Sequence, residues 1–211
     1  MIPSDTSILG GWPKRVADSV LAGAAIAAFF PLLLLLCVAV KLSSPGPVLY
    51  GHERIGPRGK PFRCWKLRTM VCDGDAVLAA HLAADPDAQR EWEETRKLTN
   101  DPRVTALGRV LRTYSVDELP RLINVLCGEM SFVGPRPVVL DELERYGPYV
   151  QAYLSARPGI TGLWQTSGRS DTSYEYRVAL DDRYVREWSF AADIRILLRT
   201  VPVVLGARVS Y

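Results

Sequence analysis

Histidine and paired cysteines are scarce in this chain of 211 residues, which narrows the kinds of site it can hold. The only histidines are His52 and His81. The four cysteines show no C-x-x-C spacing: Cys37, Cys64, Cys72 and Cys127. This pattern argues against a zinc site and against a disulfide framework. We expect reduced thiols, as in a protein that faces the cytosol.

Internal repeats and low-complexity tracts are also missing. Charged residues make up 23% of the chain and hydrophobic residues 48%, with a net charge of +3. This composition excludes a disordered or fibrous protein. The length suits one domain of ordinary size plus an appendage.

Charge is absent from the 21 residues between Val20 and Val40. A helix of that length reaches about 30 Å, the thickness of a bilayer core. Pro31 at its midpoint removes a helix hydrogen bond, and basic residues flank both ends of the run. Two interpretations stay open from the residues alone: a kinked spanning helix, or a re-entrant helix–break–helix hairpin bent at Pro31. We therefore expect a membrane segment over residues 1–45 and a polar domain over residues 46–211.

The charge changes sign along the polar part of the chain. Residues 41–70 carry seven basic side chains and one acid, whereas residues 71–100 carry seven acids and three basic side chains. A basic stretch beside an apolar segment suits anionic lipid headgroups or a phosphorylated substrate, and equally a solvated loop near a membrane. The reversal of sign argues against nucleic-acid binding.

Secondary-structure patterns predict an α+β fold that is mainly helical. Gly/Pro-rich residues 43–70 predict a small β-hairpin, or an irregular loop, with its turn at 56–59. Helical spacing predicts two exposed helices between residues 73 and 97, and further helices over 107–112, 115–126, 141–156 and 190–205. The helix over 190–205 has an apolar face, and its arginines lie away from that face. It could pack against the core of the domain or lie as an amphipathic helix in the membrane interface, and we favour the interface.

Two adjacent acids, Asp117 and Glu118, follow Arg112 in the sequence. Ser115 and Glu118 form a capping-box pattern, and taken alone Asp117 and Glu118 would be capping acids. Basic residues next to rigid turns favour a functional role for this pair instead. The planar guanidinium group of arginine can bind two phosphate oxygens at once, so these residues indicate a phosphate-binding site. One carboxylate of such a pair can hold Mg²⁺, and the other can attack phosphorus.

Several ordered motifs together resemble the bacterial sugar transferases known as monotopic phosphoglycosyl transferases. They are KLSSPGPV (41–48), Arg54-Ile-Gly, KLRTM (66–70), DELPRLINVL (117–126), GEMSFVGPRP (128–137) and PGITGLWQ (158–165). The resemblance runs from Lys14 to the C-terminus. It implies transfer of a sugar phosphate from a UDP-sugar to undecaprenyl phosphate, with release of UMP.

The same resemblance implies roles for particular residues. Asp117 would be the nucleophile that takes the phosphosugar covalently, and Glu118 would bind Mg²⁺ beside it. Phosphate or nucleotide contacts are expected from six further side chains: Lys66, Arg68, Arg112, Arg136, Gln165 and Arg169. The resemblance favours the re-entrant hairpin, although the family often has Ser-Pro where this chain has Phe30-Pro31.

The implied location is the cytoplasmic face of the bacterial inner membrane, with membrane lipid as a partner. A homodimer contact through the C-terminal helix stays an alternative use of its apolar face. Two other functions stay open: a membrane-anchored scaffold that binds nucleotide-sugar or partner enzymes without turnover, and a phosphatase that uses water as the acceptor.

Overall fold

The computed structural model describes residues 7–167 and 173–206. The α-helices, in chain order, are α1 Gly11–Ser43, α2 Gly74–Ala84, α3 Pro86–Thr95, α4 Ala106–Thr113, α5 Arg121–Cys127, α6 Leu140–Glu144, α7 Val150–Leu154, α8 Tyr174–Arg186 and α9 Phe190–Leu205. The strands are β1 Leu49–Ile55, β2 Pro61–Leu67, β3 Ser131–Val133 and β4 Gly159–Thr161. Single 3₁₀ turns are η1 Pro57–Gly59, η2 Val116–Glu118 and η3 Gly147–Tyr149. The fold is therefore mainly helical with little β-structure, as predicted.

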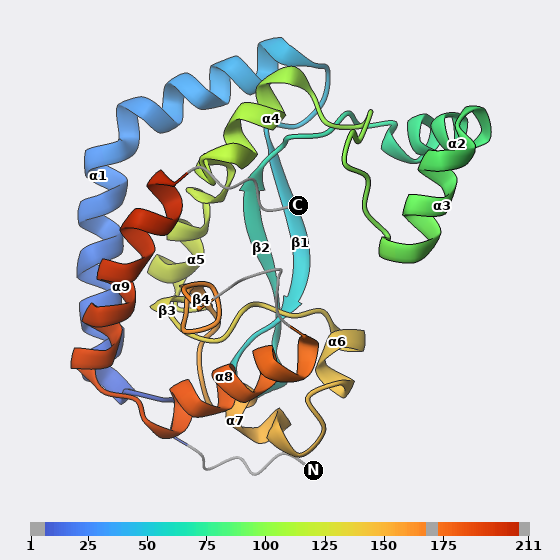
Figure 1. The fold of residues 1–211 in the computed structure, drawn as a ribbon. Helices are drawn as coiled ribbons and strands as arrows, with labels where there is room; N and C mark the ends of the chain where they lie inside the picture. Colours follow the sequence, from blue (N-terminus) through green and yellow to red (C-terminus); the bar gives the residue numbers. More distant parts are fainter. Residues whose placement is uncertain (1–6, 168–172, 207–211) are drawn as a thin grey trace.

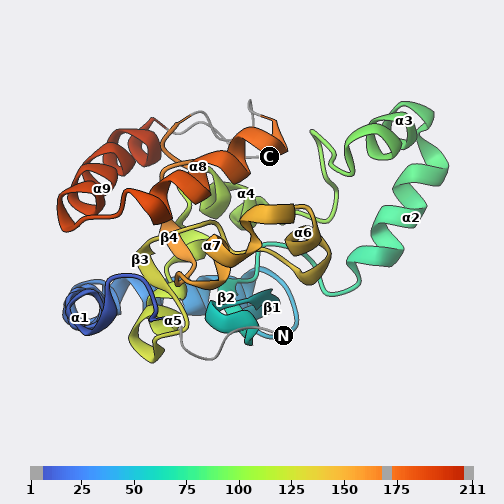
Figure 2. The ribbon, with the colours of Figure 1, turned by 90° about the horizontal axis from the view of Figure 1, so that it is seen from below.

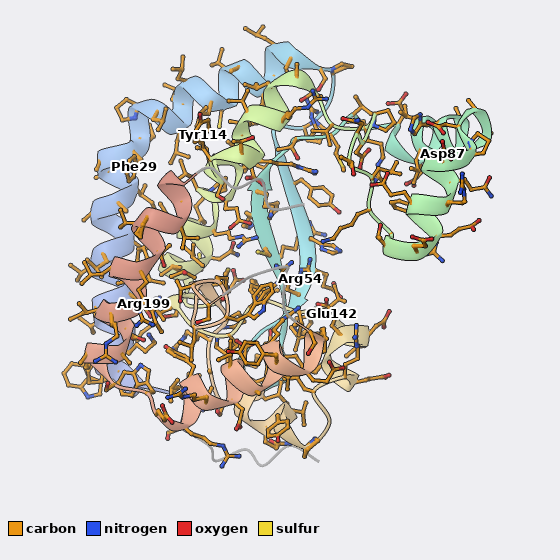
Figure 3. The ribbon with its side chains drawn as sticks, viewed as in Figure 1. Phe29, Arg54, Asp87, Tyr114, Glu142 and Arg199 are labelled. Atoms are coloured by element: carbon orange, nitrogen blue, oxygen red, sulfur yellow. The ribbon has the colours of Figure 1, made fainter. Side chains whose placement is uncertain are left out.

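Helix α1 is long and apolar enough to cross a membrane by length and composition. It rises along one side of the molecule and then turns across the top (Figure 1), and Phe29 labels the region of the turn (Figure 3). Pro31 lies inside the helix, where its ring displaces the carbonyl four residues back and bends the axis.

Both ends of α1 pack against the polar domain, while its middle does not. Near the start, Lys14 forms a buried ion pair with Asp193 of α9. Near the end, Val40 packs with Leu67 of β2 and Leu111 of α4. Between these ends, large apolar side chains are exposed: Phe29, Phe30, Leu32, Leu34, Leu35 and Val38. The helix thus presents an apolar outer surface.

The predicted hairpin is confirmed as β1 and β2, which pair antiparallel with Tyr50 opposite Lys66. Helix α5 is fixed to the outer edge of β2 by Asn124, which is fully buried. Its side chain accepts from the Trp65 N–H and donates to the Arg63 carbonyl. One side chain therefore sets the position of α5 relative to β2.

Two short strands that the sequence patterns missed, β3 and β4, pair in parallel. Their backbones lie so close that a Cβ on Gly134 would meet the Arg157 carbonyl oxygen at 2.2 Å. Glycine is required there because any side chain would separate the two segments. In Figure 2, α8 and α9 lie on one side of this pair and α1 lies on the other.

Helices α2 and α3 confirm the prediction of two helices and project away from the rest of the chain in both ribbon views (Figures 1 and 2). Asp85 separates them and caps α3 by accepting from the Asp87 and Ala88 N–H groups.

Two predicted helices are wrong in extent. The helix expected over 141–156 is divided into α6, η3 and α7, because Gly147 adopts φ +50° and Pro148 follows it. The helix expected over 115–126 begins at Arg121, and the preceding residues form η2. Ser115 makes no side-chain cap, so the capping box is not formed.

The last helix, α9, has the predicted bounds, and most of its predicted apolar face is exposed. Phe190, Ile194, Leu198 and Val201 are 45–69% exposed, whereas Ile196 is buried. Leu197, which also belongs to the predicted face, packs against the buried cluster of Val133, Tyr184 and Ile196, so the face contributes to the core in part.

Candidate active site

The acid pair occupies a strained link between two helices. Ser115 adopts φ +54° with an N–H bond to the Arg112 carbonyl, which ends α4 and starts η2. A non-glycine residue in this left-handed conformation costs about 1–2 kcal/mol, and such strain often occurs at functional sites. The turn places Asp117 and Glu118 beside β2, with the Asp117 side chain only 7% exposed.

Two cations contact the pair directly. Lys66 Nζ lies 2.8 Å from Glu118 Oε1 and 3.6 Å from Asp117 Oδ2. Arg121 Nη2, three residues after Glu118, lies 2.7 Å from the same Oε1. The Asn124 clamp on β2 holds Lys66 opposite the start of α5, so the backbone fixes this geometry before any ligand arrives.

The two carboxylates have pKa values that are displaced in opposite directions. Burial raises the pKa of Asp117, and it does so despite the attraction of Lys66. Burial also opposes ionisation of Glu118, but Arg121 and Lys66 outweigh it and hold the pKa of Glu118 below its usual range. A pair of acids with such different environments is typical of sites where the two have different chemical roles.

Arg112 and Arg136 attract the same pair from beyond ion-pair distance. Arg112 Nε donates to Thr69 Oγ1 at 2.9 Å, and its charge attracts Asp117. Arg136 follows β3, stacks over the Trp164 ring at 5.3 Å and attracts Glu118. Lys66 contacts both acids, and Arg112 and Arg136 attract them without touching them. The phosphate contacts expected of these three residues stay predictions.

Arg68 lies elsewhere. Its buried guanidinium donates to the carbonyls of Val40 and Ser44, where it holds the end of α1. Its predicted phosphate contact stays a prediction. Gln165 lies in the turn after β4, and Arg169 lies outside the described residues.

The sequence analysis missed three arginines: Arg121, which contacts Glu118, and Arg54 and Arg177, which both approach Glu142. Alternation along the hairpin could have revealed Arg54, because it shares a face with Lys66 when residues 50 and 66 are opposite each other. The spacing of three residues from Glu118 could have revealed Arg121. No local pattern marks Arg177, since α8 brings it there through tertiary packing.

Among the described residues, no group of three or more His, Cys, Asp or Glu side chains could hold a metal ion. The available donor set is the two carboxylates of Asp117 and Glu118. This set fits Mg²⁺, which usually takes one or two protein carboxylates and completes its shell with water and substrate phosphates.

Comparison with known proteins identifies the class. A family profile described as bacterial sugar transferase matches residues 10–207. The chain therefore belongs to the bacterial sugar transferase family and is a transferase. The resemblance inferred from the motifs is confirmed.

Individual relatives are similar over most of the chain. The exopolysaccharide production protein ExoY of Rhizobium meliloti is 53% identical over 213 residues, covering 100% of this chain and 94% of that protein. The UDP-glucose:undecaprenyl-phosphate glucose-1-phosphate transferase of Caulobacter vibrioides is 44% identical, covering 94% of this chain and 72% of that protein. The undecaprenyl-phosphate galactose phosphotransferase of Salmonella typhimurium is 51% identical, covering 94% of this chain but 41% of that protein.

Proposed function

We propose that this protein transfers a sugar 1-phosphate from a UDP-sugar to undecaprenyl phosphate and releases UMP. This step would begin assembly of a membrane glycoconjugate such as exopolysaccharide, capsule, O-antigen or a glycoprotein glycan. The observation that carries the proposal is the acid pair with unequal pKa directions inside a shell of basic side chains. Relatives named as undecaprenyl-phosphate galactose or glucose-1-phosphate transferases support it.

The proposed reaction has two halves. In the first, an Asp117 carboxylate oxygen attacks the sugar-linked phosphorus, the bond to the bridging oxygen breaks, and its electron pair leaves on UMP. In the second, a phosphate oxygen of the lipid attacks the same phosphorus, and the Asp117 carboxylate is regenerated. Lys66 and Arg112 would neutralise the phosphoryl oxygens during both displacements.

Partial desolvation increases the reactivity of the Asp117 carboxylate as a nucleophile. Burial raises the pKa of Asp117, which makes its carboxylate less well solvated and more basic than an exposed aspartate. Glu118 is held ionised by Lys66 and Arg121, so it is suited to Mg²⁺ binding rather than attack. When bound, Mg²⁺ would neutralise charge on the substrate phosphates.

The membrane arrangement that best suits this chemistry is a re-entrant α1, bent at Pro31, with the catalytic domain on the cytoplasmic face of the inner membrane. Both ends of α1 are held by one polar domain through Lys14 and Val40, which favours entry and exit on one side. The exposed stripe of α9 would lie in the interface. The acid pair could then meet a lipid phosphate at the level of the headgroups.

The test is UMP release in detergent with Mg²⁺, undecaprenyl phosphate and a panel of UDP-sugars. Wild-type protein should release UMP with a particular UDP-sugar and form a lipid-linked product, and Asp117→Asn should release none. Equal activity in Asp117→Asn would remove the proposed nucleophile. Free sugar phosphate without lipid product would indicate a phosphatase, and a folded protein inactive across the panel would indicate a scaffold.

A further inference from the structure

Three arginines from distant parts of the chain form a cationic cluster next to the acid pair. Arg54 comes from β1, Arg136 from the segment after β3, and Arg177 from α8. The charges of Arg54 and Arg177 both repel that of Arg136. Like charges are brought together at a cost, so a cluster of three needs an anion to compensate it.

Arg177 is the most constrained member of this arginine cluster. Its side chain is 7% exposed and stacks against the rings of Trp164 and Tyr174. Its Nε and Nη2 atoms are buried and have no hydrogen-bond partner among the described residues. Buried guanidinium N–H groups without acceptors are rare, because each forfeits its bonds to water.

The anion that lies between Arg54 and Arg177 is Glu142, on the short helix α6. Its two carboxylate oxygens lie 3.7 Å from Arg54 Nη1 and 3.8 Å from Arg177 Nη1, too far for strong hydrogen bonds. Its Oε2 atom is buried without a hydrogen-bond partner among the residues that the structure describes. Glu142 therefore balances charge but satisfies little of the hydrogen-bonding capacity around it.

The buried carboxylate of Asp181 attracts the charges of Arg177 and Arg136. The same carboxylate accepts a hydrogen bond from the Tyr146 hydroxyl at 2.8 Å. A buried anion thus lies on one side of the cluster, while Arg136 itself is exposed to solvent. Such an arrangement preorganises a guanidinium to meet a ligand from the solvent side.

The cluster is continuous with the acid pair but lies away from the apolar bend of α1. Arg136 attracts Glu118, and Arg54 is repelled by Arg121, which forms an ion pair with Glu118. In Figure 3, Arg54 and Glu142 lie near the middle of the molecule, below and to the right of Phe29 on α1. A phosphate bound here would be next to the reacting phosphorus on the side remote from the membrane-facing segment.

We propose that Arg54 and Arg136, backed by Arg177, bind the nucleotide-side phosphate of the donor, the phosphate that leaves as UMP, and that Glu142 occupies this site until the donor displaces it. The inference rests on the proposed function. A phosphate can offer three oxygens in place of one loosely held carboxylate, so it would satisfy the cluster better than Glu142 does.

The site would act on the leaving group in the first half-reaction. When the bond between the sugar-linked phosphorus and the bridging oxygen breaks, the electron pair moves onto the UMP phosphate and adds a negative charge there. Arginines already in position stabilise this charge as it develops, without reorganisation during the step.

The test measures binding of UMP alone by calorimetry, with uridine as the phosphate-free control. Arg54→Gln should weaken UMP binding about 10- to 100-fold, as expected for loss of a charge-assisted hydrogen bond. Glu142→Gln should tighten it about 2- to 5-fold because the competing carboxylate is gone. Arg58→Gln, an exposed charge on the same hairpin, is the matched control and should change UMP affinity by less than about twofold.

The Glu142→Gln variant shows whether misfolding explains the results, because a misfolded protein would not bind UMP more tightly than the wild type. In turnover, Arg54→Gln should raise the KM for the UDP-sugar and leave the KM for undecaprenyl phosphate within about twofold. A rise in the lipid KM instead would place the acceptor phosphate at this site and overturn the inference.

Unchanged UMP affinity in Arg54→Gln, or weaker affinity in Glu142→Gln, would also overturn it. In either case a wild-type enzyme that forms the lipid-linked product would leave the proposed function intact. A wild-type protein that binds neither UMP nor UDP-sugar would instead refute both.

Discussion

Replacing Lys66 by methionine should move the pH dependence of catalysis in a direction that the structure defines. Lys66 Nζ lies 3.6 Å from Asp117 Oδ2, a separation worth about 4–5 kcal/mol at an effective dielectric constant of about 20. One-third of the Lys66 side chain is exposed (34%), so screening reduces this attraction to about 1–2 kcal/mol. That range corresponds to a pKa shift of about one unit.

The sign follows from which form Lys66 favours. Burial already raises the pKa of Asp117, and Lys66 opposes this by favouring the carboxylate. Without Lys66 the pKa rises further, so a higher pH is needed to ionise the nucleophile. The acid limb of kcat/KM should therefore move up by about one unit, and the plateau should fall about 10- to 100-fold because Glu118 loses a charge-assisted bond.

The assay is the initial rate of UMP release between pH 5 and 9 at subsaturating UDP-sugar. Lys66→Arg keeps the charge and should keep the position of the acid limb. Lys60→Met removes an exposed lysine from the same hairpin and should behave as wild type. An acid limb that stays in place in Lys66→Met, with Lys60→Met as reference, would refute the assignment of that limb to Asp117.

Three further predictions concern stability, measured as the unfolding free energy in detergent. Asp193→Ala should cost about 3–5 kcal/mol, because it leaves Lys14 buried and unpaired between α1 and α9. Gly134→Ala should cost about 2–3 kcal/mol by forcing β3 and β4 apart, whereas Gly23→Ala, with open space at its Cβ, should stabilise α1 by up to about 1 kcal/mol. Burial raises the pKa of Asp181 to about 6, so the folded state keeps a proton that the unfolded state releases near pH 4. The free energy of unfolding should therefore fall by up to about 3 kcal/mol as the pH rises from 4 to 7. Asp181→Asn should flatten that fall.

Each stability prediction has a result that would contradict it. Arg183→Gln breaks an ion pair whose side chains are 63% and 64% exposed, and it should cost no more than about 1 kcal/mol. A loss in Asp193→Ala no larger than in Arg183→Gln would mean that the α1–α9 ion pair is not structural. Equal effects of Gly134→Ala and Gly23→Ala would contradict the prediction that β3 and β4 need a glycine at their contact. Parallel profiles of unfolding free energy against pH for wild type and Asp181→Asn would contradict the prediction for Asp181.

Local patterns predicted the elements whose stability comes from local chemistry. The hairpin followed from a Gly/Pro-rich segment with its turn at residues 56–59, and α9 followed from its apolar spacing, with bounds at Phe190 and Leu205. The acid pair and three of its basic neighbours were predicted as site residues, because the resemblance to the family rests on short contiguous motifs.

Tertiary contacts decided the remainder. β3 and β4 are three residues each, and they pair only because glycines at 134 and 159 allow close approach. The capping-box pattern at Ser115 did not cap a helix, since its backbone takes a left-handed conformation that the surrounding packing imposes. Arg177 was missed because its neighbours Trp164 and Glu142 are distant in the sequence.

The most direct test of the central claim, that Asp117 takes the phosphosugar covalently, is the intact mass of the protein after mixing with UDP-sugar and Mg²⁺ in the absence of lipid acceptor. The wild-type protein should gain the mass of one sugar phosphate, release an equal amount of UMP, and carry the adduct on the peptide that contains Asp117. Asp117→Asn should gain no mass, and Glu118→Gln should gain it more slowly. Release of UMP only when undecaprenyl phosphate is present, with no adduct at any time, would contradict a covalent intermediate and require direct transfer between the two substrates.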